Sequence, residues 1–379
     1  MKIGRIETFL VPPRWLFVRV ETDDGAIGWG EASLEGHAEA VAGAFEPLKD
    51  RFVGHDPRRI EDIWQSGYRG GFYRGGPVFM SALSGLDQAL WDLKGRVNGL
   101  PVWEMLGGRA RDRIRAYAWI GGDRPEDIAE AARSRATQGF GAVKMNATAE
   151  LDWLGTPKLF DEVVKRVEAA QAEGLDVGLD FHGRIHKAMA KQLAKRLEPL
   201  GLLFIEEPLL SENPEGIAQI SNLVSTPIAL GERLYSRWDF KPFLASGSVD
   251  IIQPDLSHAG GISECRRIAA MAEAFDVAVA PHCPLGPLAL AACMQIATTT
   301  PNFVIQEMSL DIHYNVGHDL LNFVVDKESL SPSDGYLAVP EKPGLGITID
   351  EVAVREADKD RHRWRNPIWR QRDGSFTEW

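Results

Sequence analysis

The stretch LDVGLDFHG, residues 175–183, ends an apolar run with two ionisable side chains, Asp180 and His182. Successive side chains of a β-strand point to opposite faces, so these two are expected on one face and the apolar side chains between them on the other. One such strand could be a coincidence. The same pattern recurs along the chain, however, which indicates strands that deliver functional groups to a common place.

Short apolar runs that end in polar residues repeat at a steady interval from about residue 113 onward. Successive intervals of 26, 26, 23, 27 and 25 positions separate Asp180, Glu206, Glu232, Asp255, His282 and Glu307. Each interval fits one strand, one helix and two loops. Amphipathic segments such as 158–174 lie between the runs. Alternating strands and helices are typical of a parallel sheet, and eight units predict closure into a (β/α)₈-type barrel of the α/β class.

The two ends of the chain lack this repeat. Residues 1–112 combine two strands joined at an Asp-Gly turn with a long helical pattern, and we predict an α+β domain there. The barrel is expected over 113–315. A C-terminal segment over 316–379 is expected to pack back on the N-terminal domain, with three tryptophans buried there: Trp364, Trp369 and Trp379.

Composition and charge exclude several classes of protein. A net charge of −12 argues against nucleic-acid binding, even though RHRWRNPIWRQR, residues 361–372, is rich in Arg. No run approaches the ~20 apolar residues of a membrane helix, so no membrane association is expected. Three cysteines are an odd and sparse set, which favours reduced thiols and a cytoplasmic location.

The polar residues at the strand ends are the candidates for chemistry. They are Lys144, Asn146, Asp180, His182, Glu206 or Glu207, Glu232, Asp255, His282 and Glu307. Three carboxylates on consecutive strands cannot all remain ionised at close range without a cation. Oxygen ligands at a convergent point suit Mg²⁺ better than Zn²⁺. Alternation leaves open which acid of the pair 206–207 faces inward.

Six motifs together carry a resemblance to a known family. They are PPRW (12–15), GFYRGGP (71–77), LDFHGR (179–184), IQPDLSHAGGI (252–262), APHCPLGP (280–287) and WRNPIWR (364–370). The chain resembles the acid-sugar dehydratases of the mandelate-racemase-like branch of the enolase superfamily. The resemblance implies an α+β N-terminal capping domain, a modified TIM-like (β/α)₇β barrel, and one Mg²⁺ per subunit held by Asp180, Glu206 and Glu232.

The resemblance also implies a role for each remaining group. His282 would be the base, Asp255 would raise its basicity, and His182 would give a proton to a leaving hydroxyl. Glu307 would stabilise the transition state, and Lys144 would add positive charge. Substrate contacts are expected from Asn146, Arg14, Trp15, Tyr73 and Arg74. We assign no direct role to the other histidines, His258 among them.

One departure from the superfamily pattern narrows the expected reaction. Where racemases of this branch have Lys-x-Lys, this chain has Lys144-Met145-Asn146, and an amide is not a base. Proton removal from one face only favours β-elimination of water over racemisation. D-galactonate is the expected substrate, with galactarate, gluconate and mannonate as alternatives, and a homo-oligomer is the expected assembly.

Two readings from other classes compete with the dehydratase. A Schiff-base aldolase would use Lys144 as its nucleophile, but the three carboxylates count against it. A non-catalytic scaffold is disfavoured because the full set of metal ligands and His282 is present.

Overall fold

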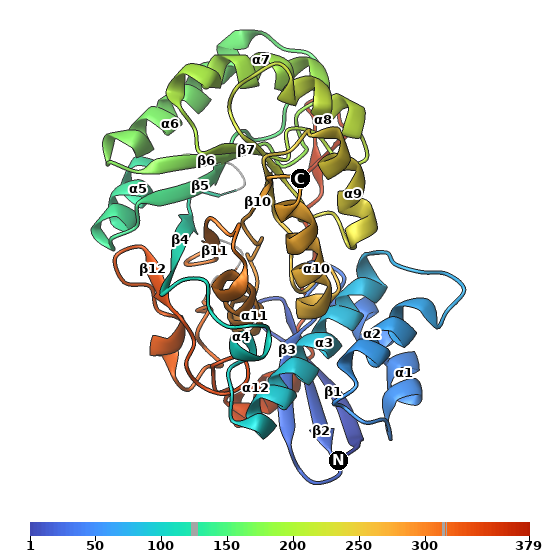
Figure 1. Cartoon of the computed structure of the whole chain (residues 1–379). Coiled ribbons are helices and arrows are strands. Elements are labelled where there is room, and N and C mark those ends of the chain that lie inside the picture. Colours follow the sequence, from blue (N-terminus) through green and yellow to red (C-terminus); the bar gives the residue numbers. More distant parts are fainter. Residues whose placement is uncertain (123–127, 313–314, 316) are drawn as a thin grey trace.

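The computed structural model describes residues 1–122, 128–312, 315 and 317–379. Figure 1 shows a smaller body at the N-terminal end of the chain and a larger one built from strands and helices. The smaller body begins with an antiparallel sheet in which β2 is the central strand. Its elements are β1 (Ile3–Val11), β2 (Trp15–Thr22), β3 (Ile27–Glu31), α1 (Ala38–Phe52), α2 (Ile60–Arg69), α3 (Pro77–Asn98) and α4 (Val102–Met105). This is the predicted α+β capping domain.

The larger body is a parallel sheet of eight strands that curls into a barrel. Seven strands follow one another from β4 to β10, and β11 pairs with β4 on the other side. They are β4 (Arg113–Trp119), β5 (Ala142–Asn146), β6 (Asp176–Asp180), β7 (Phe204–Glu206), β8 (Ile228–Leu230), β9 (Ile251–Ile252), β10 (Ala278–Val279) and β11 (Gln306–Met308). A parallel bridge between Val279 and Phe303 joins β10 to the segment that leads into β11, so the sheet closes on itself.

Helices connect successive barrel strands and cover the outside of the sheet (Figure 1). They are α5 (Ile128–Thr137), α6 (Asp161–Ala172), α7 (Lys187–Leu197), α8 (Pro214–Ser221), α9 (Arg237–Ser246), α10 (Gly261–Glu273) and α11 (Pro287–Thr299). Short 3₁₀ turns, η1 (Pro157–Phe160) and η2 (Glu198–Leu200), extend two of them. No helix follows β11 directly among the described residues. The order is the (β/α)₇β arrangement that the family resemblance implies.

A small apolar cluster fills the barrel interior and supports the polar groups above it. It consists of Tyr117, Ala142, Phe204, Ala229, Ala280 and Ile305. Gly178 completes this layer because a Cβ there would meet the ring of Phe204. Side chains two positions further along a strand point to the same side. The residues two positions after Ala142, Gly178, Phe204, Ala280 and Ile305 are Lys144, Asp180, Glu206, His282 and Glu307.

The C-terminal segment contacts both bodies. Its elements are η4 (Lys327–Leu330), β12 (Tyr336–Ala338), α12 (Glu351–Asp358), β13 (Trp369–Arg370) and β14 (Phe376–Thr377). Helix α12 lies on the capping domain, where Arg355 pairs with Glu7 at 3.0 Å. Strand β12 pairs instead with β4 of the barrel. The predicted boundary at 315–316 falls partly outside the described residues.

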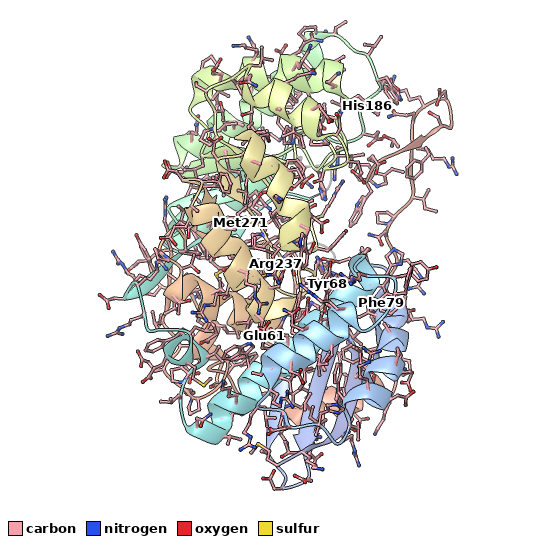
Figure 2. The ribbon with its side chains drawn as sticks, turned by 45° about the vertical axis from the view of Figure 1, so that its right-hand side comes forward. Glu61, Tyr68, Phe79, His186, Arg237 and Met271 are labelled. Atoms are coloured by element: carbon pink, nitrogen blue, oxygen red, sulfur yellow. The ribbon has the colours of Figure 1, made fainter. Side chains whose placement is uncertain are left out.

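Buried polar contacts join the capping domain to the barrel. The Glu31 carboxylate, at the end of β3, accepts hydrogen bonds from the backbone N–H groups of Gly286 and Ala289 at the start of α11. Asp87 of α3 binds Ser263 at the start of α10. In Figure 2 Arg237 of α9 lies near Tyr68 and Glu61 of α2, at the same boundary. No helix of the described chain is long and apolar enough to cross a bilayer.

Candidate active site

Three carboxylates converge where β6, β7 and β8 end. Asp180 is the last residue of β6, Glu206 is the last of β7, and Glu232 follows β8 by two positions. One oxygen from each carboxylate lies within 4.8 Å of the other two. The spacing of strand-end acids along the sequence therefore corresponds to a cluster in space.

Lys144 of β5 lies beside this cluster. Its Nζ is 2.8 Å from Glu206 Oε1, 2.8 Å from Glu307 Oε1 and 4.0 Å from Asp180 Oδ2. Burial disfavours the ammonium ion, yet the neighbouring carboxylates of Glu206 and Glu307 hold the pKa of Lys144 well above its ordinary value. An amine that stays protonated is a poor nucleophile, which argues against the Schiff-base reaction. Lys144 instead supplies fixed positive charge.

One ammonium group does not neutralise three buried acids. Burial, together with the nearby Glu232 carboxylate, raises the pKa of Asp180 to about 7. Burial and the charges of Asp180, Glu307 and Glu232 raise the pKa of Glu206 to about 8. Carboxylate oxygens in such an arrangement are the donors that hard divalent cations prefer. The residues present therefore fit a divalent metal ion.

The structure separates the two adjacent acids that alternation left undecided. Glu206 faces the cluster, and Gln253 Nε2 donates to its Oε2 at 2.6 Å. Strand β7 ends there, and Glu207 has φ of 41°, a left-handed conformation that turns its side chain elsewhere. The Glu207 carboxylate accepts from Ser211 Oγ at 3.2 Å. Glu206, and not Glu207, is in the carboxylate cluster.

A His–Asp pair lies on the adjacent side of the barrel. Asp255 Oδ2 is 2.8 Å from His282 Nδ1, and the backbone N–H of Ser257 donates to Asp255 Oδ1. The other ring nitrogen, Nε2, lies 3.1 Å from Glu232 Oε2. Burial disfavours the imidazolium, but the carboxylates of Glu232 and Asp255 hold the pKa of His282 well above its ordinary value.

His182 reaches the same cavity by a route that strand alternation does not describe. Strand β6 ends at Asp180, and His182 has φ of 55°, with its backbone N–H bonded to Asp180 Oδ1 at 2.6 Å. The prediction that His182 continues the strand face is therefore wrong. Arg184 Nη2 lies 3.0 Å from His182 Nδ1, and a guanidinium can only donate. Burial and the charge of Arg184 lower the pKa of His182 to about 3.

Most of the predicted groups line one cavity of about 670 Å³. Its barrel wall includes Lys144, Asp180, His182, Glu232, His282 and Glu307. Glu206 lies beneath these groups, fully buried. Asn146 is buried outside the lining, where its Nδ2 donates to Gly122 O. The volume suits a small organic ligand.

The capping-domain predictions have mixed outcomes. Arg14 lines the cavity, pairs with Glu35 at 2.9 Å and donates to Pro284 O. Trp15 is fully buried in the hydrophobic core and does not reach the cavity. The Tyr73 side chain is 91% exposed, and neither it nor Arg74 lines the cavity. The expected substrate contacts of Trp15, Tyr73 and Arg74 therefore gain no support from this placement.

Two parts of the cavity wall were not anticipated from the sequence. His258 lies in the loop after β9, with Nδ1 3.7 Å from Asp255 Oδ2 and Nε2 2.9 Å from Ser33 O of the capping domain. Its position three residues after Asp255 was the available signal. Residues 365–368 together with Phe376, Glu378 and Trp379 form the other part. Trp369 is buried and its ring contacts Arg184 of the barrel, whereas Trp364 and Trp379 are only partly buried. The prediction that all three tryptophans are buried on the capping domain is wrong.

Family models match both bodies of the chain. Residues 11–107 match the mandelate racemase/muconate lactonizing enzyme N-terminal domain, and residues 126–353 match the enolase C-terminal domain-like family. The D-galactonate dehydratase of Ralstonia pickettii is 52% identical over 382 residues, and that of Pectobacterium atrosepticum is 50% identical over the same length. Each alignment covers the whole of both chains.

Solved structures share the whole architecture. An enolase from Agrobacterium radiobacter, crystallised with Na and L-malate, superposes with a TM-score of 0.88 and 32% identity over the full length of both chains. A structure from Zymomonas mobilis ZM4 has a TM-score of 0.87 and 32% identity, covering 94% of this chain and 98% of the other. These values agree with the capping domain and barrel described above.

Proposed function

The chain belongs to the mandelate racemase/muconate lactonizing enzyme family of the enolase superfamily, and from this premise we propose that it is a hydro-lyase acting on D-galactonate. The products are 2-dehydro-3-deoxy-D-galactonate and water. The observation that carries the proposal is a sequence identity of 50–52% to proteins named D-galactonate dehydratase. Each alignment covers the whole of both chains. The convergent acids and the His–Asp pair support it.

Asp180, Glu206 and Glu232 would hold the metal ion, and we propose Mg²⁺ because all three donors are carboxylate oxygens. When bound, the ion supplies Lewis-acid stabilisation of negative charge on the substrate carboxylate. Lys144 adds a fixed positive charge next to Glu206 and Glu307. Glu307 would stabilise the second carboxylate oxygen in the transition state. These groups lower the cost of charge that develops when the C2–H bond breaks.

The two histidines divide the proton transfers. His282 Nε2 takes the C2 proton while Asp255 stabilises the resulting imidazolium through Nδ1. The electrons of the C2–H bond form the C2–C3 double bond, and the C3–O bond breaks. His182 would give the proton with which the hydroxyl departs as water, which requires that bound substrate raise its pKa from the value of about 3 in the free site. The enol product then takes a proton at C3 and becomes the 2-keto acid.

The substrate assignment is tested by incubating the protein and Mg²⁺ with a panel of acid sugars and measuring loss of one water by mass spectrometry. D-galactonate should react with the highest kcat/KM. Faster dehydration of galactarate, gluconate or mannonate would reassign the substrate and leave the reaction type intact. Failure to dehydrate any member of the panel would overturn the proposed function.

We propose a cytoplasmic homo-oligomer as the working form. All three cysteines are buried free thiols, which suits a reducing compartment. The assembly can be measured by light scattering of the purified protein.

A further inference from the structure

Residues 364–379, which we call the roof segment, run from the capping domain to the mouth of the barrel. Near its start, Arg365 forms a two-pronged ion pair with Glu39 of α1, with N–O distances of 2.7 and 3.1 Å. Further along, Gln371 Nε2 donates to Leu151 O in the loop after β5 at 2.8 Å. Figure 1 shows the C-terminal end of the chain beside the barrel near α8 and α9. The segment therefore bridges the two bodies across the cavity.

Side-chain packing holds the roof segment at both ends. Trp369 of β13 is buried, with the guanidinium of Arg184 4.8 Å from its ring centroid. In the capping domain, Gly36 has φ of 74°, and a Cβ there would collide with the Asn366 side chain. The loop at Gly36 and the roof segment are thus fitted closely together, and both line the cavity. The roof segment is therefore a packed part of the cavity wall.

Within the roof segment, Trp379 lies next to His182, the proposed proton donor. Its ring centroid lies 6.0 Å from that of His182 and 5.8 Å from that of Trp364. Trp364 in turn lies under the guanidinium of Arg14, 5.4 Å from its ring. Together these side chains contribute aromatic surface and a cation to the wall of the cavity next to His182.

The proposed function, on which this inference rests, gives the bound substrate a direction. The carboxylate lies at the cation ligands, C2 lies at His282, and the 3-hydroxyl lies at His182. We infer that the chain beyond C3 continues toward Trp379, which lines the same cavity beside His182. An indole ring offers an apolar face to the C–H groups of a polyol and an N–H donor to its hydroxyls.

We propose that Trp379 is a specificity-determining residue that contacts C5 and C6 of a six-carbon acid sugar. An aromatic side chain that merely covered the core would affect stability and treat all substrates alike. A residue that contacts only the distal carbons must discriminate by chain length. This difference can be measured.

The test compares D-galactonate with L-threonate, a four-carbon acid that has the same configuration at C2 and C3 but no carbons beyond C4. L-threonate is measured as a competitive inhibitor, so it need not be turned over. For Trp379→Ala we expect KM for D-galactonate to rise about 10-fold, because aromatic side chains in packed pockets are among those whose truncation weakens binding most. The inhibition constant of L-threonate should change less than about twofold. Trp379→Phe should restore most of the affinity.

Phe275→Ala is the matched control, because Phe275 is 48% exposed near the end of α10 and does not line the cavity. It should leave both constants unchanged. Equal changes for the two acids in Trp379→Ala, or no change for either, would overturn the inference. Wild-type protein that dehydrates no acid sugar would instead overturn the proposed function. Thermal unfolding of each variant separates loss of folding from loss of binding.

Discussion

His282 Nδ1 lies 2.8 Å from Asp255 Oδ2, and this contact turns the opposite ring nitrogen toward the cavity. Asp255 is itself held by the backbone N–H of Ser257 at 2.6 Å. A carboxylate on Nδ1 fixes the tautomer and raises the basicity of Nε2. The base is therefore oriented before substrate arrives.

Replacing His282 by Asn should remove the base and leave the cavity intact. We expect kcat for dehydration to fall by about 10²–10⁴-fold or more, the usual range for a general base. Exchange of the C2 proton with D₂O should be lost as well, and NMR of the recovered substrate measures it. His55→Asn, in the capping domain away from the cavity, is the control and should behave as wild type. Normal exchange in the His282 variant would reassign the base.

Replacing His182 by Asn should separate proton removal from loss of the hydroxyl. Dehydration should fall by about 10²–10⁴-fold because the leaving group receives no proton. Exchange at C2 should continue, since His282 and Asp255 are untouched. Parallel loss of exchange and dehydration would show that His182 does not act on the leaving group alone. The same NMR experiment, run beside a product assay, gives both rates.

The sequence was sufficient to predict the barrel because strand-end spacing survives even where strands are very short. Strand β9, for example, has only two residues, Ile251 and Ile252. The choice between Glu206 and Glu207 was beyond pattern alone, because it depends on a left-handed turn that alternation does not encode. The predicted strand position of His182 was wrong for the same reason, because His182 lies in a turn and not in β6.

Contacts between segments far apart in the sequence were the other feature that the sequence did not predict. His258 receives its orientation from Ser33 O, a residue 225 positions away. The ring of buried Trp369 contacts Arg184 of the barrel, and no local pattern distinguishes that surface from the capping domain. Amphipathic periodicity predicts that a side chain is buried but does not name the surface that buries it.

Glu206→Gln and Glu207→Gln form a matched pair that tests the metal site without relying on turnover. Losing a partner outside the coordination shell commonly weakens metal binding by about 10–100-fold, so losing a direct ligand should weaken it by at least about 100-fold. Calorimetric titration of Glu206→Gln with Mg²⁺ should show this loss. Glu207→Gln should stay within about 10-fold of wild type because its carboxylate bonds Ser211 instead. Equal losses in both variants would contradict the ligand assignment.

Glu31 should make stability depend on pH, because burial raises its pKa from 4.5 to about 7. An acid with a raised pKa holds its proton more tightly in the folded state than in the unfolded state. The contribution of Glu31 to the free energy of unfolding is therefore fully present below about pH 4.5 and is lost as pH rises through about pH 7. Between about pH 5.5 and about pH 8 the loss is roughly 2 kcal/mol. Glu31→Gln removes the titration and should flatten that part of the curve.

The measurement is the thermal midpoint of wild type and Glu31→Gln across this pH range. Other buried acids, such as Asp87 with a pKa raised by burial to about 7, titrate in both proteins, so only the difference between the two curves reports on Glu31. Glu46→Gln, at an exposed position of α1, is the control and should follow wild type. The midpoint of Glu31→Gln relative to wild type should increase as pH rises, because only wild type bears the cost of ionising a buried carboxyl. Parallel curves would mean that the Glu31 carboxyl is not desolvated at the boundary between capping domain and barrel.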